Sequence, residues 1–288
     1  MNVDYAAIAA AVRGRRLSEA DIHMLATESA CPLAEVKHCL QDLVKQQAGI
    51  WLPAVARERR GWVCNRCGGR ECQEWPSARG WAATCLRCRS MGAVTSLQLI
   101  YQDQRALCRN DQPVRFCPEF LLTEAQECAA QEVLSFVQGN EARALLWAAC
   151  GAGKTEVCFP ALAWALERGY SVLIAAPRRD VIDDIAPRLR HDFPDVPMQV
   201  LTGSSTERFA SGVVVVVATT HQVLRFARVF DWVILDEVDA FPYRDNEMLR
   251  WGLENALVEG GKLLCLTATP AVEQFRQMKK GLLAQIRL

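Results

Sequence analysis

The sequence has no excess of charge of either sign. Its 288 residues include 33 lysine and arginine residues and 33 aspartate and glutamate residues, so its formal net charge is zero. Overall charge therefore gives no indication of a nucleic-acid partner. The sequence also lacks an apolar run near the roughly 20 residues that span a bilayer. Its first residues lack the basic and then apolar pattern of a signal peptide. There is no internal repeat and no low-complexity segment, which excludes solenoids and biased linkers.

What the sequence does have is enough apolar residues for a core, and many cysteines. Hydrophobic residues make up 51% of the chain, and its length predicts about two domains. Without a secretory pattern, the thirteen cysteines are better explained as metal ligands or buried thiols than as disulfides. We expect Cys150, Cys158 and Cys265 to act as small hydrophobic residues, because each falls inside a predicted buried element.

One stretch predicts a phosphate-binding loop. The apolar run 144–149 is typical of a buried parallel strand, and the turn 150–153 consists of small residues. Lys154 and Thr155 then open an amphipathic helix that we expect to end at Gly169. Gly151 and Gly153 let the backbone turn tightly, so that N–H groups and a helix N-terminus can face an anion. The predicted nucleotide-binding residues here are Cys150, Gly151, Ala152, Gly153, Lys154 and Thr155. The alternative is an accidental Gly-Lys-Thr on a strand–turn–helix.

Two acidic residues predict the second part of a nucleotide site. Asp236 and Glu237 directly follow the apolar residues 232–235, about 80 residues after the loop. An acid at such a strand end holds Mg²⁺ together with the hydroxyl of a residue such as Thr155. Glu237 would orient or deprotonate the attacking water. The predicted catalytic residues are therefore Lys154, Thr155, Asp236 and Glu237. A solvated strand end is the alternative.

Short apolar strands alternate with helical patterns through the second half of the chain. We expect strands at 170–176, 198–201, 213–218, 232–235 and 263–266. This alternation predicts an α/β fold with a parallel sheet covered on both faces. The polar clusters follow the strands, at the edge where such folds bind ligands. We therefore assign residues 116–288 to one P-loop lobe.

Two Cys-x-x-Cys pairs predict a zinc module at 57–115. Cys64, Cys67, Cys85 and Cys88 have the spacing of a structural four-thiolate zinc site, with seventeen residues between the pairs. Cys72 is a fifth cysteine nearby, which we treat as a spare that could compete as a ligand. A redox pair would explain one Cys-x-x-Cys but not two.

The same segment is the basic part of the chain. It contains eleven arginines, no lysine and five acidic residues, a difference of +6, and a zinc–thiolate centre would reduce this to about +4. Arginines flank the cysteines, and tryptophans are interleaved with them. These residues are Arg66, Arg70, Arg87, Arg89, Trp62, Trp75 and Trp81. Such a set suits phosphate contact and base stacking on single strands, with Arg66 and Arg87 as candidates. Alternatively, the arginines offset the thiolate charge and the tryptophans form the module's core.

Residues 1–56 predict a small helical domain. Apolar residues recur at helical spacing from Ile22 to Ala26 and from Leu33 to Val44, and Ser18 followed by Asp21 is typical of a helix start. Two helices and a turn could be a helix-turn-helix DNA reader. They could equally be a bundle that packs on the rest of the chain or binds a partner.

Taken together, the motifs resemble those of superfamily 2 helicases, which are related to the DEAD-box proteins. Residues 148–155 resemble motif I, residues 236–239 motif II and residues 267–269 motif III. The resemblance implies that the lobe is RecA-like and that Thr267 and Thr269 couple ATP to strand contacts. It implies an adenine-reading motif at Thr123 and Gln126. It also implies DNA-backbone contacts at Pro177, Arg178, Thr202, Gly203, Thr220 and His221.

A zinc module that precedes such a lobe resembles the ComFA family, the DNA-uptake ATPases of natural competence. The resemblance implies a DNA-dependent ATPase, with ATP and Mg²⁺ bound and zinc as a structural ion, that translocates single-stranded DNA during uptake. It implies a cytoplasmic protein held at the membrane by other competence proteins. A phosphoribosyltransferase-like partner similar to ComFC is expected, and homo-oligomerisation stays open. The alternatives are a PriA-like or restriction-type helicase, although the PriA cysteines follow the motor motifs, and a non-enzymatic zinc-dependent DNA-binding adaptor.

The sequence ends about twenty residues after motif III, before the second RecA-like lobe of that family. We therefore expect the chain to hold the N-terminal region, the zinc module and the first lobe. Because an arginine finger on the second lobe typically contributes about 10³–10⁵ in rate, hydrolysis by these residues alone should be very weak.

Overall fold

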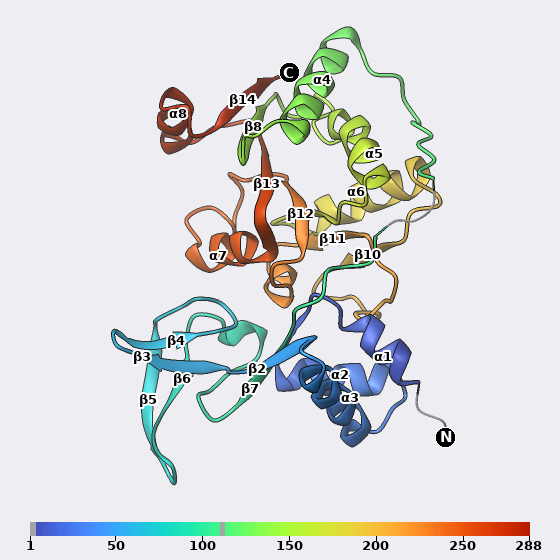
Figure 1. The fold of residues 1–288 in the computed structure, drawn as a ribbon. Helices are drawn as coiled ribbons and strands as arrows, with labels where there is room; N and C mark the ends of the chain where they lie inside the picture. The colour runs from blue at the N-terminus through green and yellow to red at the C-terminus, as the bar shows by residue number, and fades with distance from the viewer. Residues whose placement is uncertain (1–3, 110–112) are drawn as a thin grey trace.

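The computed structural model describes residues 4–109 and 113–288. A parallel α/β lobe forms one end of the molecule, and two smaller N-terminal parts form the other (Figure 1). The lobe's seven-stranded sheet has the order β10-β11-β9-β12-β13-β8-β14, and every neighbouring pair is parallel. The strands are β8 (Arg143–Trp147), β9 (Val172–Ala176), β10 (Met198–Leu201), β11 (Val215–Thr219), β12 (Phe230–Leu235), β13 (Leu257–Thr267) and β14 (Ala284–Arg287). The predicted α/β class is confirmed.

Three helices cover one face of this sheet. They are α4 (Glu124–Gln138), α5 (Phe159–Glu167) and α6 (Arg179–Asp192). Their buried residues, such as Leu162 and Ile185, form one apolar cluster with Ile174 and Ile234 of the central strands. A shorter helix, α8 (Val272–Lys279), precedes the edge strand β14.

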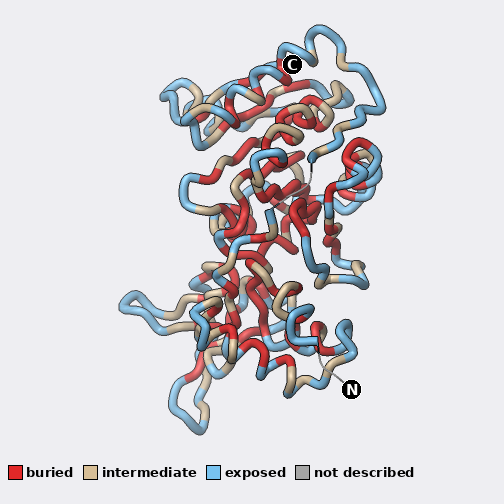
Figure 2. The backbone as a smooth tube through the Cα atoms, turned by 45° about the vertical axis from the view of Figure 1, so that its right-hand side comes forward, coloured by how far each residue is buried: buried red, intermediate tan, exposed pale blue. Residues whose placement is uncertain are grey.

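The opposite face is covered differently. It carries the helix α7 (Glu247–Ala256) and the 3₁₀ turn η3 (Gln222–Arg225). The cysteine segment extends the core on this side: Cys67 and Cys85 belong to the same buried cluster as Leu173 and Val233 of the sheet, and Gly68 packs against Trp251 of α7. Buried backbone continues from the sheet into this segment (Figure 2). The cysteine segment is therefore part of the lobe's core.

The N-terminal domain combines helices with a small antiparallel sheet. The helices are α1 (Tyr5–Ala11), α2 (Glu19–Glu28) and α3 (Leu33–Lys45). Ser18 caps α2 through a capping box with Asp21, as its spacing predicts. The sheet has the order β1-β7-β2, with β1 (Arg16–Leu17), β2 (Gly49–Pro53) and β7 (Leu99–Asp103).

This sheet corrects the expected division at residues 56 and 57. Strand β7 follows the cysteines in sequence, yet it pairs with β1 and β2. The cysteine module, residues 54–98, is thus inserted between two strands of the N-terminal domain. It consists of the hairpin β3 (Val55–Glu58)–β4 (Gly61–Cys64), the hairpin β5 (Cys72–Ser77)–β6 (Gly80–Cys85) and the 3₁₀ turn η1 (Arg89–Met91).

Buried arginines join the N-terminal domain to the lobe. The Arg15 guanidinium lies 4.8 Å from the centroid of the Phe226 ring and donates a hydrogen bond to Gln199 of β10. Burial lowers the pKa of Arg15 to about 9. Arg225, at the end of η3, forms an ion pair with Asp21 of α2. Since η3 belongs to the lobe, these contacts fix the two parts against each other.

The helix after the glycine turn starts later than expected. Residues Glu156–Cys158 form a 3₁₀ turn, η2, and the regular helix α5 begins only at Phe159. Pro160 explains the shift, because it has no N–H to donate to the carbonyl of Glu156 in a helix that began at Lys154. At the second position of a new helix, that missing donor costs little.

Replacing Gly68 by alanine tests how the cysteine module packs on α7. An added Cβ would lie 2.6 Å from the Trp251 indole, and the backbone has a left-handed φ of +68°. Gly281 has the same φ with open space around it, so Gly281→Ala carries the backbone strain alone. In urea unfolding, we expect Gly68→Ala to lose about 1–3 kcal/mol more stability than Gly281→Ala, the cost of overpacking. Equal losses would contradict this interface.

Candidate nucleotide site and metal centre

The predicted phosphate loop lies at the C-terminal end of β8. Gly151 and Gly153 have φ angles of +74° and +77°, which favour glycine, and the predicted residues Cys150 and Ala152 complete the turn. Cys150 is exposed there, which corrects its expected place inside a buried element, whereas Cys158 is buried. The Lys154 ammonium folds back over the turn and donates to the carbonyl of Ala149 at 2.9 Å. An anion bound in the loop could therefore replace this carbonyl as the hydrogen-bond acceptor of the lysine.

Thr155 and Asp236, the expected magnesium pair, are in contact. The Thr155 hydroxyl donates to Oδ2 of Asp236 at 3.1 Å, although the residues are 81 positions apart in sequence. Both are largely buried, and burial raises the pKa of Asp236. Hydroxyl and carboxylate oxygens side by side beside a phosphate loop are the donor set that Mg²⁺ prefers.

Glu237 adopts an unusual backbone conformation. Its φ is +49°, a left-handed value that is uncommon for residues other than glycine. Within the described part of the chain, its buried Oε2 atom has no hydrogen-bond partner. Burial raises the pKa of this carboxyl group. A strained residue with an unsatisfied oxygen at a strand end is typical of a functional position.

Asp239 connects the acidic motif to the predicted coupling residues. The Thr267 hydroxyl donates to Oδ1 of Asp239 at 2.7 Å, and the Thr269 hydroxyl donates to Oδ2. Burial raises the pKa of Asp239, but these hydrogen bonds outweigh it and the net shift is downward. The sequence pattern assigned no separate role to Asp239, although its position at the end of the motif was a signal. The structure joins the two motifs through this one side chain.

Thr123 and Gln126 hold α4 against the loop. Thr123 is the N-cap of α4, and the Gln126 side chain accepts from the Thr123 N–H at 2.9 Å. The Gln126 amide donates to the carbonyl of Ala152 at 2.9 Å. Both ends of the Gln126 amide are thus engaged within the protein. Its expected reading of an adenine edge would require one of these bonds to open.

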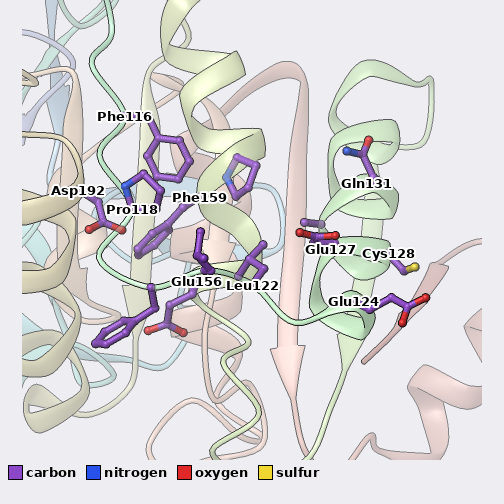
Figure 3. A pocket seen from close by; sticks show the side chains of 14 residues that line it. Phe116, Pro118, Leu122, Glu124, Glu127, Cys128, Gln131, Glu156, Phe159 and Asp192 are labelled. Carbon is purple, nitrogen blue, oxygen red and sulfur yellow. The ribbon is translucent and has the colours of Figure 1, made fainter.

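A cavity of about 790 Å³ connects these groups. Its lining includes Lys154, Thr155, Asp236, Glu237 and Arg178. A more apolar hollow of about 500 Å³ shares Phe120, Leu121 and Leu122 with it, and reaches Phe159 of α5 and the helix α4 (Figure 3). The polar cavity suits phosphates and metal. The shared apolar segment suits a flat, uncharged group.

The expected DNA-backbone residues follow β9, β10 and β11, but few of their side chains are free. Arg178 lines the nucleotide cavity and pairs with Asp180, so its place favours phosphate of a nucleotide over DNA. Pro177, Thr202 and Thr220 are buried. Gly203 is exposed and His221 is half-buried; burial lowers the pKa of His221.

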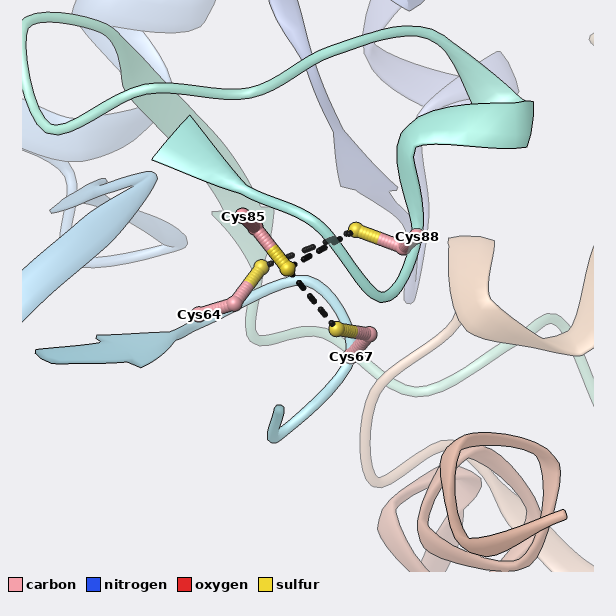
Figure 4. A group of neighbouring side chains, drawn as sticks. All are labelled: Cys64, Cys67, Cys85 and Cys88. Carbon is pink, nitrogen blue, oxygen red and sulfur yellow. Dashed lines mark hydrogen bonds between the residues drawn. The ribbon is translucent and has the colours of Figure 1, made fainter. Parts of the chain in front are cut away.

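The four predicted zinc ligands come together in one buried group (Figure 4). Their sulfur atoms lie within 4.8 Å of one another, with separations of 3.6 Å for Cys67–Cys85 and 3.8 Å for Cys64–Cys88. A tetrahedral zinc site with Zn–S bonds near 2.3 Å requires sulfur atoms about 3.8 Å apart. The four thiols therefore fit zinc. Since all four would be protein ligands, no position is left for catalysis.

Arg66 is buried and not available to DNA, which corrects our expectation for it, whereas Arg87 is partly exposed and held in two ion pairs. Arg66 is 5% exposed, and its guanidinium donates to Sγ of Cys88 at 3.0 and 3.3 Å. Arg87 pairs with Glu71 in the module and with Glu247 of α7. Buried negative charge on the thiolates draws Arg66 inward. Composition alone could not distinguish this place from an exposed one.

Comparison with known proteins places the chain in a family. Residues 123–278 match the model of the DEAD/DEAH box helicase family. The chain belongs to this family. It is also 33% identical over 82% of its length to the competence protein ComFA of Bacillus subtilis (strain 168), and 35% identical over 85% to ComFA of Streptococcus pneumoniae. The ATP-dependent DNA helicase RecG of Streptococcus pneumoniae is 28% identical over 58% of the chain and 27% of its own length.

The resemblance to ComFA expected from the motifs is confirmed. The matches cover 51% and 55% of the two ComFA proteins, so the chain spans about half the length of these relatives. The family supports a helicase-like ATPase associated with competence. Within the described residues, no helix is long and apolar enough to cross a membrane.

Arg66→Gln should accelerate the loss of zinc without removing a ligand. Its donors offset thiolate charge, and outer partners of metal ligands typically contribute about 10- to 100-fold in affinity. A chromogenic chelator would follow zinc release over time. Arg89→Gln is the matched control, because Arg89 lies exposed in the same module. Equal release from both variants would show that Arg66 does not stabilise the centre.

Proposed function

We propose that the chain is the ATP-binding part of a translocase that moves single-stranded DNA during uptake of transforming DNA. The observation that carries the nucleotide half of this proposal is the contact of Thr155 with Asp236 behind the glycine turn. The two ComFA relatives support the competence context. Translocation, the strand preference and the direction of movement are the parts that experiment must test.

In this proposal, the phosphates of ATP lie in the glycine turn. Lys154 reaches the β- and γ-phosphates, and Thr155 and Asp236 hold Mg²⁺. The unsatisfied oxygen of Glu237 orients the attacking water and takes its proton. The base extends toward the apolar segment Phe120–Leu122, which borders the cavity. Asp239 then transmits a change at the acidic motif to Thr267 and Thr269.

Zinc in the four-cysteine site is structural in this proposal. Bound zinc would hold the two Cys-x-x-Cys turns together and neutralise half of the four thiolate charges. The residues of the chain do the rest: Arg66 donates to Cys88, and the four side chains pack beneath the sheet.

The module's outer surface supports a single-stranded DNA partner. Its three acidic residues are all engaged: Glu58 with Arg70, Glu71 with Arg87, and Glu74 with the Trp62 indole. Five exposed arginines form no ion pair within the described part of the chain. They are Arg57, Arg59, Arg60, Arg79 and Arg89. Trp81 is 63% exposed beside them in sequence. Unpaired arginines and an open indole suit phosphate contact and base stacking.

The DNA-reader reading of residues 1–56 has less support. The charged residues of α3 are mixed, and Lys45 and His38 both approach Asp42 on the same helix. A recognition helix carries a basic surface, which α3 lacks. We propose instead that the N-terminal domain braces the lobe. A ComFC-like partner, other competence proteins at the cytoplasmic face of the membrane, and self-association belong to this proposal as extensions of the ComFA resemblance.

A second candidate is a duplex-unwinding helicase, which the similarity to RecG favours. Because these residues alone should hydrolyse ATP only very weakly, forked DNA distinguishes the two in a protein that carries both RecA-like lobes. A translocase hydrolyses ATP on single strands with little unwinding, whereas a helicase separates the fork. A chain that binds DNA without ATP and binds no nucleotide would support the remaining alternative, a non-enzymatic zinc-dependent DNA-binding adaptor.

Lys154→Ala should weaken binding of a fluorescent ATP analogue in the presence of Mg²⁺. Loss of one hydrogen bond to a charged group predicts a fall of about 10- to 100-fold in affinity. Asp236→Asn should remove the dependence on Mg²⁺. Lys279→Ala, an exposed lysine of α8, serves as the control and should bind as the unchanged protein does. Undiminished binding by Lys154→Ala would contradict the proposed site.

Replacing Arg59 and Arg60 together by glutamine should weaken single-stranded DNA binding. Each phosphate contact contributes about 0.7 to the slope of log affinity against log salt, so the slope should fall by about 1.4. Arg276→Gln, an exposed arginine of α8, is the control. Fluorescence anisotropy across a salt series measures both. An unchanged slope with wild-type affinity would show that DNA does not contact the turn between β3 and β4, which carries Arg59 and Arg60.

A further inference from the structure

The zinc module holds a fifth thiol directly opposite one of its ligands. Cys72 opens strand β5, and its partner across the antiparallel ladder is Cys85 of β6. The hairpin is closed by Ser77 and Gly80 around a two-residue turn. Counting from this closing pair, Cys72 and Cys85 fall at a non-hydrogen-bonded position, where paired side chains project to the same face. Cys72 therefore faces the metal centre from outside its ligand set.

This pairing has the dimensions of a disulfide. The Cα atoms of a non-hydrogen-bonded pair are about 4.5 Å apart, within the range of about 4.4–6.8 Å that disulfides span. The backbone spacing typical of this ladder position is therefore compatible with a Cys72–Cys85 link. The same geometry keeps Cys72 out of the four-sulfur group, whose members each lie within 4.8 Å of the others.

Access differs between Cys72 and the ligands. Cys64, Cys67, Cys85 and Cys88 are fully buried, whereas Cys72 is half-buried at the edge of the hairpin. Arg66 also donates to Sγ of Cys88 from within the module. A small oxidant from solvent therefore reaches the Cys72 sulfur before it reaches a ligand, although burial raises the pKa of this thiol to about 11 and so slows its oxidation.

We propose that Cys72 makes the zinc centre sensitive to peroxide by forming a disulfide with Cys85. In the first step, hydrogen peroxide oxidises the Cys72 thiol to a sulfenic acid and releases water. In the second step, the Cys85 thiolate attacks the Cys72 sulfur, the S–S bond forms and hydroxide leaves. Two electrons pass from the two sulfurs to peroxide. Cys85 is lost as a ligand, and zinc dissociates from the three that remain. A thiol reductant reverses the chemistry.

The consequence would extend into the lobe. The four ligands lie in the buried cluster beneath the sheet, together with Val233 and Leu249 of the lobe. Oxidation at Cys72 would thus loosen the cover of one face of the sheet. This inference rests on zinc occupying the four-cysteine site, which is part of the proposed function.

The test is peroxide-driven zinc release from the whole chain. Zinc content is measured first, because a protein without zinc would refute the metal centre itself and not the role of Cys72. Zinc released by hydrogen peroxide is then followed with a chromogenic chelator for the unchanged protein, Cys72→Ser and Cys72→Ala. Cys117→Ser, which removes an exposed thiol remote in sequence, is the control.

We expect both Cys72 variants to bind zinc as the unchanged protein does and to release it several-fold more slowly, with Cys117→Ser unaffected. Mass spectrometry of the oxidised protein should find the Cys72–Cys85 peptide pair, which dithiothreitol removes. Equal release rates in all four proteins, or a disulfide only among the ligands themselves, would overturn the proposal. A Cys72 variant that loses zinc before oxidation would also overturn it, since Cys72 would then support the centre directly.

Discussion

A parallel sheet must be covered on both faces, and on this molecule the cover of the second face is continuous with the cysteine module. Helices α4, α5 and α6 fill the first face, and among the described residues the lobe itself covers the second with α7 and a 3₁₀ turn. The buried cysteines extend the same apolar cluster beyond α7. Structural zinc contributes about 10–16 kcal/mol to folding of small zinc domains, as much as the whole stability of a typical domain, about 5–15 kcal/mol. Zinc bound as proposed would contribute on this scale to holding the cysteine module in the apolar cluster that it shares with α7.

The two N-terminal parts both contact segments that connect the lobe's strands, namely α7 and the turn η3. Helix α7 follows the acidic motif, and it meets the module through Trp251 against Gly68 and Glu247 against Arg87. The turn η3 follows Thr220 and His221, and the N-terminal domain holds it through Asp21 and Arg225. Contacts at both points leave the lobe and the N-terminal parts little freedom to move separately. Any movement driven by ATP would therefore occur between this unit and a domain or protein outside the described residues.

The sequence predicted what is local and missed what is decided in three dimensions. The glycine turn, the acidic pair and the cysteine pairs each lie within a few residues, so spacing alone located them. The partners of β7 could not be predicted, because β2 lies about 50 positions away with the cysteine module between them. The predicted DNA contact of Arg66 was wrong for a related reason. The number of arginines in a basic segment does not show whether one of them faces solvent or a cysteine sulfur atom. The predicted start of α5 was wrong because the helical spacing of apolar residues does not reveal the effect of Pro160, which delays the regular helix to Phe159.

The three acids of the 236–239 motif differ in burial and in hydrogen-bond partners, and these differences suit them to different roles. Asp239 accepts two hydroxyl hydrogen bonds, which lower its pKa and commit it to holding Thr267 and Thr269. Asp236 accepts from Thr155, and its charge is placed for a cation. Glu237 has a pKa raised by burial and an oxygen with no partner among the described residues. Burial raises the pKa of both Asp236 and Glu237, so hydrogen bonding and not the pKa separates these two acids. Of the three acids, only Glu237 has a carboxylate oxygen without a hydrogen-bond partner among the described residues, which suits its proposed role of accepting a proton from water.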